Sequence, residues 1–341
     1  MLKLFQSIFG GGEARGRYPE SLVEMAIERA VDGSDGRLRA LSGYRKRLRE
    51  PVIQAIDQVL AMVEALPAPV PAAVADYSND LRLRALFVSP DHMREVLGND
   101  PVLSAYREQA GAASAEPVFG LLLAERREKR GFGLELAGDT VQRDVAQTTV
   151  SFTGHRLVDI SSDEEALRRE LRRRAFDHLI ALALARISEM KGERLELGHQ
   201  RELLRAKLAT LSRGGWSFDD KAKEGSDPAA LQAELDGIEQ QLAGLGKDVG
   251  ILDGELDILA ETLASADKQL WADVVELHLD RMNVKRAVSD ESATTLRFGE
   301  LHNAQGQSLV MLLVALKPDE LPKRGSFSDN VARALAELGG R

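Results

Sequence analysis

A regular leucine spacing in the second half of the chain constrains the fold more than any other feature. From Leu231 onward, apolar residues recur at steps that alternate between four and three. The twelve positions are Leu231, Leu235, Ile238, Leu242, Leu245, Val249, Leu252, Leu256, Leu259, Leu263, Ala266 and Leu270. This spacing is typical of a helix that packs along a coiled-coil seam. It predicts a helical arm over residues 231–270.

The preceding segment carries a matching apolar series, interrupted by Arg194 and Arg201. Its members are Phe176, Ile180, Ala183, Ile187, Met190, Leu197, Leu204, Leu208 and Leu211. Two helical arms joined by a loop of about twenty residues are expected to fold back as an antiparallel hairpin. If the seams pair as read, the numbers of facing residues sum to about 442. Leu204 then faces Ile238, and Leu197 faces Leu245.

The charge distribution favours the same pairing. Residues 219–280 contain 16 acidic and 4 basic side chains, a net charge of −12, whereas residues 163–212 contain 11 basic and 9 acidic, a net charge of +2. An acidic arm is more stable beside a basic one than in isolation. The acidic arm also holds glycines off its seam, and each costs about 0.5–1 kcal/mol relative to alanine. We therefore expect a soft or bent arm.

The regions that flank the hairpin have different patterns. Residues 19–112 contain short amphipathic segments that begin with proline or with Ser-Pro and Asp-Pro, which predicts a bundle of short helices. Alternating apolar residues and glycine turns occur in residues 113–162 and return in residues 281–322. We expect these two stretches to form one small antiparallel sheet, split by the hairpin at residues 163–280.

The predicted fold is therefore α+β and predominantly α. An amphipathic leader (1–18) precedes the helical bundle (19–112), the split sheet follows with the coiled-coil hairpin inserted, and residues 323–341 form a C-terminal tail. No apolar run reaches the roughly 18 residues that a membrane-spanning helix needs, and the N-terminus lacks the apolar core of a secretory signal. These features favour a cytoplasmic location, with peripheral membrane attachment as an alternative.

The sequence contains no motif for chemistry. The absence of cysteine excludes disulfides and thiolate metal sites, the six histidines do not fall at metal-ligand spacings, and the chain has no phosphate-binding loop. We therefore assign no catalytic residue and expect neither a metal nor a cofactor. Binding is a better interpretation than catalysis.

Three groups of residues are candidates for binding. The first is an arginine cluster that could contact phosphates of nucleic acid or lipid, or could simply pair with nearby acids. The second is an apolar arc of the leader that could dock on a membrane or on the protein itself. The third is a pair of aromatic residues at the hairpin tip, which could contact a partner or cap the last seam layer. In that order the residues are Arg168, Arg169, Arg172, Arg173 and Arg174; Leu2, Leu4, Phe5, Ile8 and Phe9; and Trp216 and Phe218.

The leading functional hypothesis is a non-enzymatic scaffold or adaptor that presents the hairpin to a protein partner, with the membrane surface as a further contact. The first alternative is a nucleic-acid-associated protein that uses the arginine cluster. The second is an enzyme with an unrecognised site in the β domain. The seams could also be shared between two copies of the chain, so a homo-oligomer is a further alternative.

Overall fold

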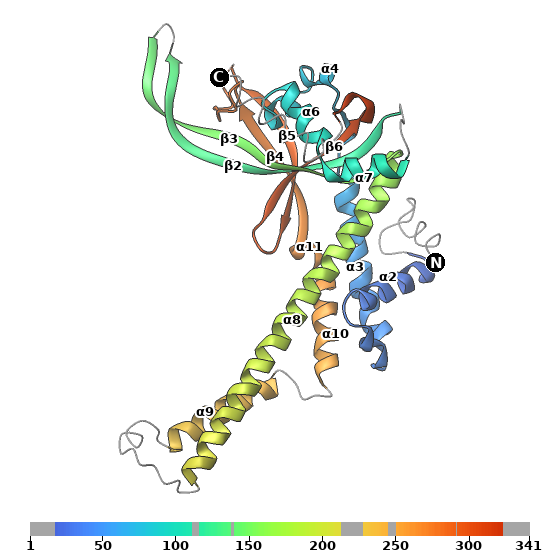
Figure 1. Ribbon diagram of the computed structural model, residues 1–341, viewed down its shortest axis with the longest axis vertical. Coiled ribbons are helices and arrows are strands. Elements are labelled where there is room, and N and C mark those ends of the chain that lie inside the picture. The colour runs from blue at the N-terminus through green and yellow to red at the C-terminus, as the bar shows by residue number, and fades with distance from the viewer. Residues whose placement is uncertain are drawn as a thin grey trace, which may run out of the picture. The chain divides into compact units, whose positions relative to one another are not determined.

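The computed structural model describes residues 18–110, 116–137, 140–212, 228–244, 250–290 and 292–322 (Figure 1). The α-helices are α2 (Glu20–Asp32), α3 (Tyr44–Glu64), α4 (Val74–Tyr77), α5 (Leu81–Leu86), α6 (Pro90–Gly98), α7 (Pro101–Ala110), α8 (Glu164–Ser212), α9 (Pro228–Gly244), α10 (Ile251–Ala264) and α11 (Ala266–Gln269). The 3-10 helices are η1 (Gly36–Ala40) and η4 (Pro318–Glu320). The strands are β1 (Val70–Pro71), β2 (Val118–Ala137), β3 (Thr140–Ser161), β4 (Leu270–Leu279), β5 (Thr294–Asn303) and β6 (Ser308–Leu316). The chain is a mixed α+β protein, as the sequence predicts.

The described residues divide into two compact units. The β unit contains residues 58–175 and 270–322, and the helical unit contains residues 18–57 and 176–269. The helices expected to form one N-terminal bundle over residues 19–112 are shared between the two units. Helices α4–α7 lie in the β unit, whereas α2 and the first turns of α3 lie in the helical unit.

The β unit is built on a six-stranded sheet in the order β3-β2-β6-β5-β4, with β1 paired to β6 beyond the end of β5. All pairs along the main order are antiparallel. Strands β3 and β6 lie on either side of the helical insertion in sequence, so their presence in one sheet confirms the predicted split sheet. Strands β5 and β6 are joined by a turn between Asn303 and Gly306, with Gly306 at a positive φ of 76°.

Strand β6 is buried on both faces, which explains its uninterrupted apolar sequence. Val310, Leu312 and Val314 point into one core cluster, which also contains buried residues of α5, α6 and α7. Met311 and Leu313 point into the opposite cluster with Val63 of α3 and Leu167 of α8. The period of two along the strand thus assigns each side chain to one of two helical layers.

Strand β4 corrects the predicted end of the hairpin. The sequence predicts a seam that ends at Leu270 and a helical insertion that ends at residue 280. Leu270–Leu279 is instead an edge strand that pairs with β5 along its whole length. Residues 282–288 lie in the stretch expected to join the sheet (281–322) but contribute only isolated bridges, such as Val284 to Thr149. Backbone pairing with β5 outweighs the helical spacing of these residues, since a short apolar run suits either structure.

Buried apolar faces and ion pairs between elements hold the helical unit together. Helix α2 buries the face that its spacing predicts, and its Arg29 pairs with Asp177 of α8. Arg47 of α3 lies 2.7 Å from Asp253 of α10. Arg47 therefore neutralises part of the acidic arm, together with Lys191 and Arg205 of the basic arm.

Helices α8 and α9 pack together through part of the predicted seam. Leu204 of α8 is buried in one cluster with Leu235 and Ile238 of α9. Arg205 Nη2 lies 2.6 Å from Glu239 Oε1 beside this cluster. Leu204 and Ile238, an expected pair, share this cluster, whereas Leu245, the expected partner of Leu197, lies outside the described residues. The second arm is not one described helix, because α9 ends at Gly244 and α10 begins at Ile251.

Within the described residues, no helix has both the length and the apolar character that crossing a membrane requires.

Candidate functional site

Two of the three predicted binding groups cannot be placed. Trp216 and Phe218 at the expected hairpin tip lie outside the described residues, and so do the leader residues Leu2, Leu4, Phe5, Ile8 and Phe9. These assignments remain predictions from the sequence.

The third group, the arginine cluster, makes contacts within the β unit. Arg168 donates hydrogen bonds to the carbonyl oxygens of Val63 and Leu66 at the end of α3, at 2.8 and 3.1 Å. Arg172 is almost fully buried and pairs with Glu165. The other members are also engaged: Arg173 pairs with Glu170, Arg174 pairs with Asp159, and Arg169 has an interaction of its own. These contacts favour the structural interpretation of the cluster.

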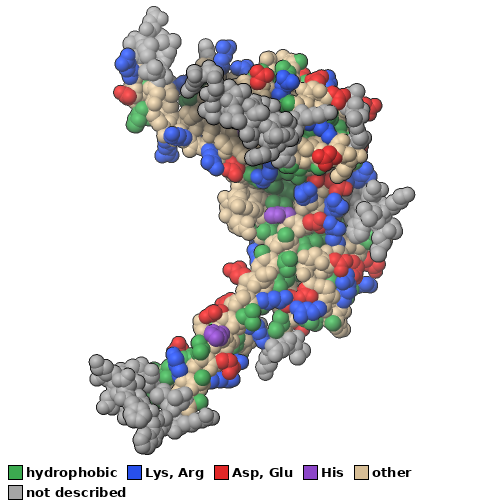
Figure 2. Space-filling model, in the orientation of Figure 1, with side chains coloured by type: hydrophobic (Ala, Val, Ile, Leu, Met, Phe, Trp, Pro, Cys, Tyr) green, Lys and Arg blue, Asp and Glu red, His purple; other side chains and the backbone are tan. Residues whose placement is uncertain are grey.

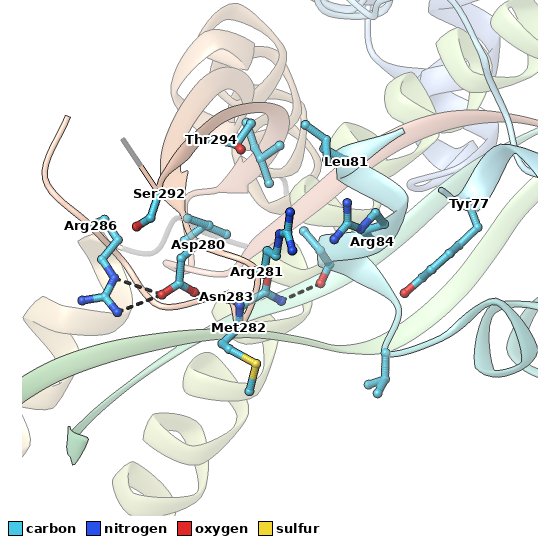
Figure 3. Close-up of a pocket in the computed structure, with 14 residues that line it drawn as sticks. Tyr77, Leu81, Arg84, Asp280, Arg281, Met282, Asn283, Arg286, Ser292 and Thr294 are labelled. Carbon is cyan, nitrogen blue, oxygen red and sulfur yellow. Dashed lines mark hydrogen bonds and ion pairs between the residues drawn. The ribbon is translucent and has the colours of Figure 1, made fainter. Parts of the chain in front are cut away.

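A basic hollow of the β unit lies elsewhere, between α5 and the segment that joins β4 to β5 (Figure 3). It has a volume of about 920 Å³. Arg84 comes from α5, whereas Asp280, Arg281 and Arg286 come from the segment after β4. The other lining residues are Tyr77, Leu81, Ala85, Val88, Leu279, Met282, Asn283, Ser292, Thr294 and Leu296.

Asp280 organises the segment after β4. Its Oδ1 accepts the backbone N–H groups of Met282 and Val284 at 2.8 and 3.0 Å, and its Oδ2 accepts Arg286 Nε at 2.9 Å. Asn283 has a positive φ of 56°, which asparagine tolerates better than most residues, and its side chain donates to the Ala85 carbonyl oxygen at 2.9 Å. This segment is therefore fixed against α5, and the charge of Asp280 is balanced by Arg286.

The pocket consequently carries an excess of positive charge. Its charged lining residues are three arginines and one aspartate. Arg84 and Arg281 extend into the same hollow, as Figure 3 shows, and neither has a salt bridge within the part of the chain that the structure describes. The nearby Asp80 is already occupied by Arg82, whose Nη2 lies 2.6 Å away. The net charge of the whole chain is −9, so the pocket and the chain carry net charges of opposite sign.

A partly aromatic cluster supports the wall of the pocket at Val88. His155 Nε2 bonds to the Leu86 carbonyl oxygen at 2.8 Å, and its ring stacks on Phe87 with centroids 4.7 Å apart. His92 Nδ1 accepts the Val88 N–H at 3.3 Å. Burial lowers the pKa of His155, and the neighbouring His92 lowers it further. Burial also raises the pKa of Tyr77, whose hydroxyl donates to the Phe87 carbonyl oxygen.

The lowered pKa of His155 predicts a pH dependence of stability for the β unit. The unfolded chain binds a proton at this residue at a higher pH than the folded chain does. The free energy of unfolding should therefore fall as the pH drops below about 6.5, the ordinary pKa of histidine. The measurement is urea unfolding followed by Trp271 fluorescence, in a Trp216→Phe background so that only the β unit reports. His155→Gln should flatten the slope between about pH 7 and pH 5. If His155→Gln leaves the slope of unfolding free energy against pH unchanged, His155 is not the source of the pH dependence.

Comparison with known families, proteins and structures adds nothing to this geometry. No family model, curated protein or solved structure matches the chain. Function must therefore be inferred from the site itself.

Sequence reasoning missed the pocket. Arg84 and Arg281 are 197 residues apart, and neither belongs to a recognisable motif. The available signal was the pairing of arginine with apolar residues in LRLRAL and in DRMNVKR. It does not reveal that the two segments meet.

Proposed function

We propose that the chain is a non-enzymatic adaptor that presents an antiparallel coiled-coil hairpin to a protein partner. The hairpin would comprise α8 and α9. Its support is the cluster of Leu204, Leu235 and Ile238, together with the ion pair between Arg205 and Glu239. Coiled-coil hairpins display their outer faces for contact while the seam holds the two helices together.

The observation that carries the proposal is a set of exposed leucines on α8. Leu195 is 76 % exposed, Leu203 50 % and Leu184 38 %. At 3.6 residues per turn, Leu184 and Leu195 differ in direction by about 20°, and Leu203 follows about 80° further round. Leu195 points away from the seam residue Leu197, since residues two apart lie on opposite sides of a helix. Hydrophobic side chains along this helix are visible in Figure 2. Exposed leucines on one side of a helix are suited to contact a partner, which would cover them.

A photo-crosslinking residue at position 199 tests the proposal. His199 is exposed on α8, one turn from both Leu195 and Leu203. In the native cell we expect one discrete crosslinked protein. Its yield should fall about thirty-fold in the Leu195→Ser/Leu203→Ser variant, because two apolar contacts of roughly 1 kcal/mol each are lost. Trp216→Ser/Phe218→Ser should lower the yield further if the tip also makes contact.

The control removes two exposed apolar side chains elsewhere. Val274→Ser/Val288→Ser lies in the β unit, and these valines are 68 % and 78 % exposed. It should leave the crosslink unchanged. Because the chain has no cysteine, a pair introduced at positions 204 and 238 reports on the hairpin itself. Disulfides between chains would favour a shared coil, and a crosslink insensitive to the leucines would contradict the adaptor surface.

The alternatives receive less support. The predicted nucleic-acid interpretation depends on arginines that make contacts within the protein. The enzyme interpretation would need a group of reactive side chains. The pocket beside α5 instead offers positive charge and apolar surface, which suit binding.

A further inference from the structure

The arginine-lined pocket of the β unit has features of a second binding site, independent of the hairpin. Two guanidinium groups, those of Arg84 and Arg281, share one hollow (Figure 3). The local acids do not neutralise them, because Asp80 is held by Arg82 and Asp280 by Arg286. Each guanidinium can bind a carboxylate or a phosphate through two parallel hydrogen bonds. The site is therefore complementary to an anionic ligand.

The surroundings of the arginines are aliphatic and open. Val88 is 89 % exposed and Met282 is 78 % exposed, and Leu81 lies on the same wall as Arg84. Such large apolar side chains gain free energy when a ligand covers them. The ligand should therefore combine negative charge, which the arginines can bind, with apolar groups that can cover Val88 and Met282.

This combination distinguishes among classes of ligand. Single-stranded nucleic acid is usually held by exposed aromatic faces as well as by cations. Tyr77 is the aromatic residue among the described lining residues, and it is partly buried with its hydroxyl engaged by Phe87. A membrane surface is contacted by protruding basic and apolar groups, whereas these arginines line a hollow. An extended acidic peptide can place carboxylates at the arginines and aliphatic side chains against Val88 and Met282.

We propose that this pocket binds an acidic segment of a protein partner in which carboxylate and aliphatic side chains alternate. The proposal does not depend on the hairpin. The adaptor would then contact proteins at two separate places, one through exposed leucines and one through charge complementarity.

Fluorescence anisotropy with the full-length protein tests this site. The probe is a labelled peptide of alternating glutamate and leucine. Matched peptides replace glutamate by glutamine or leucine by serine. We expect saturable binding of the first peptide with a Kd below about 1 mM, and weaker binding of both matched peptides. Arg84→Gln/Arg281→Gln should raise the Kd about ten-fold or more, since hydrogen bonds to charged groups are lost.

The matched control is Arg127→Gln/Arg173→Gln, which makes the same charge change at exposed, paired arginines outside the pocket. It should change the Kd by less than about two-fold. All variants should unfold at the wild-type urea concentration, because the substituted side chains are exposed. Equal weakening by both variants would reduce the effect to overall charge and overturn the proposal. So would failure of the glutamate-leucine peptide to bind, or tighter arginine-dependent binding of single-stranded DNA or anionic vesicles.

Discussion

Replacing Phe298 by alanine should destabilise the β unit by about 3–5 kcal/mol, because it removes a large aromatic side chain from a packed core. Phe298 is 1 % exposed at the centre of β5, and its ring centroid lies 5.4 Å from that of Phe152 on β3. The residue therefore joins two strands that are far apart in the sheet order. Urea unfolding followed by Trp271 fluorescence, in the Trp216→Phe background, measures the loss.

The same substitution at Phe132 provides the control. Phe132 lies on β2, where this strand pairs with β3, and it is 79 % exposed. Phe132→Ala should change the free energy of unfolding by less than about 0.5 kcal/mol. If both variants lose a similar free energy of unfolding, burial of Phe298 in the core does not account for the stability of the β unit.

A second large effect should follow from Lys191→Met in the helical unit. Glu255 of α10 is fully buried, and Lys191 Nζ lies 2.9 Å from its Oε1. Without the lysine, the nearest remaining cation is Arg37, at 3.9 Å. Removal of one partner from a fully buried ion pair costs about 3–5 kcal/mol. Lys191 is about one-third exposed and Arg37 remains, so we expect about 2–3 kcal/mol.

A double-mutant cycle separates the effect of losing the Lys191 side chain from the effect of leaving Glu255 without its partner. Lys191→Met/Glu255→Met should be less destabilised than Lys191→Met, because no buried carboxylate remains without its partner. Asp35 belongs to the same group of charges, because its Oδ2 lies 3.5 Å from Lys191 Nζ, but hydrogen bonds from Arg37 hold its pKa well below the usual range. Far-UV circular dichroism during urea unfolding reports on this helical unit. Additive losses across the cycle would contradict the coupling of Lys191 to Glu255.

The features that sequence analysis predicted are those with a strong local period. The alternation of four and three residues predicts that Leu204 and Ile238 pack together, and the period of two identifies β5. The sequence predicts helix for the residues of β4, because their apolar positions fit both the helical period and the strand period of two. Only its pairing with β5, a contact between distant residues, decides the outcome.

The candidate sites were predicted less well, for a related reason. A run such as Arg168–Arg174 is visible in sequence, as are its local partners Glu165 and Glu170, but its other partners come from elsewhere in the chain. Arg174, for example, is held by Asp159 of β3, and Arg168 by carbonyl groups at the end of α3. The pocket poses the converse problem: Arg84 and Arg281 are unremarkable in sequence until folding brings α5 beside the segment after β4.

The central position of β6 imposes an order on folding during synthesis. Strand β2 pairs with β3 and with β6, from Val118 opposite Leu316 to Ala124 opposite Val310. The β2–β3 hairpin is complete at Ser161, yet β6 ends only at Leu316. At typical translation rates the intervening residues take about 8–30 s to make. During this interval Leu121, Leu122 and Leu123 lack their final neighbour, and an unpaired apolar strand edge is prone to aggregation. The insertion between β3 and β4 therefore lengthens the time for which this apolar edge of the nascent chain is unpaired.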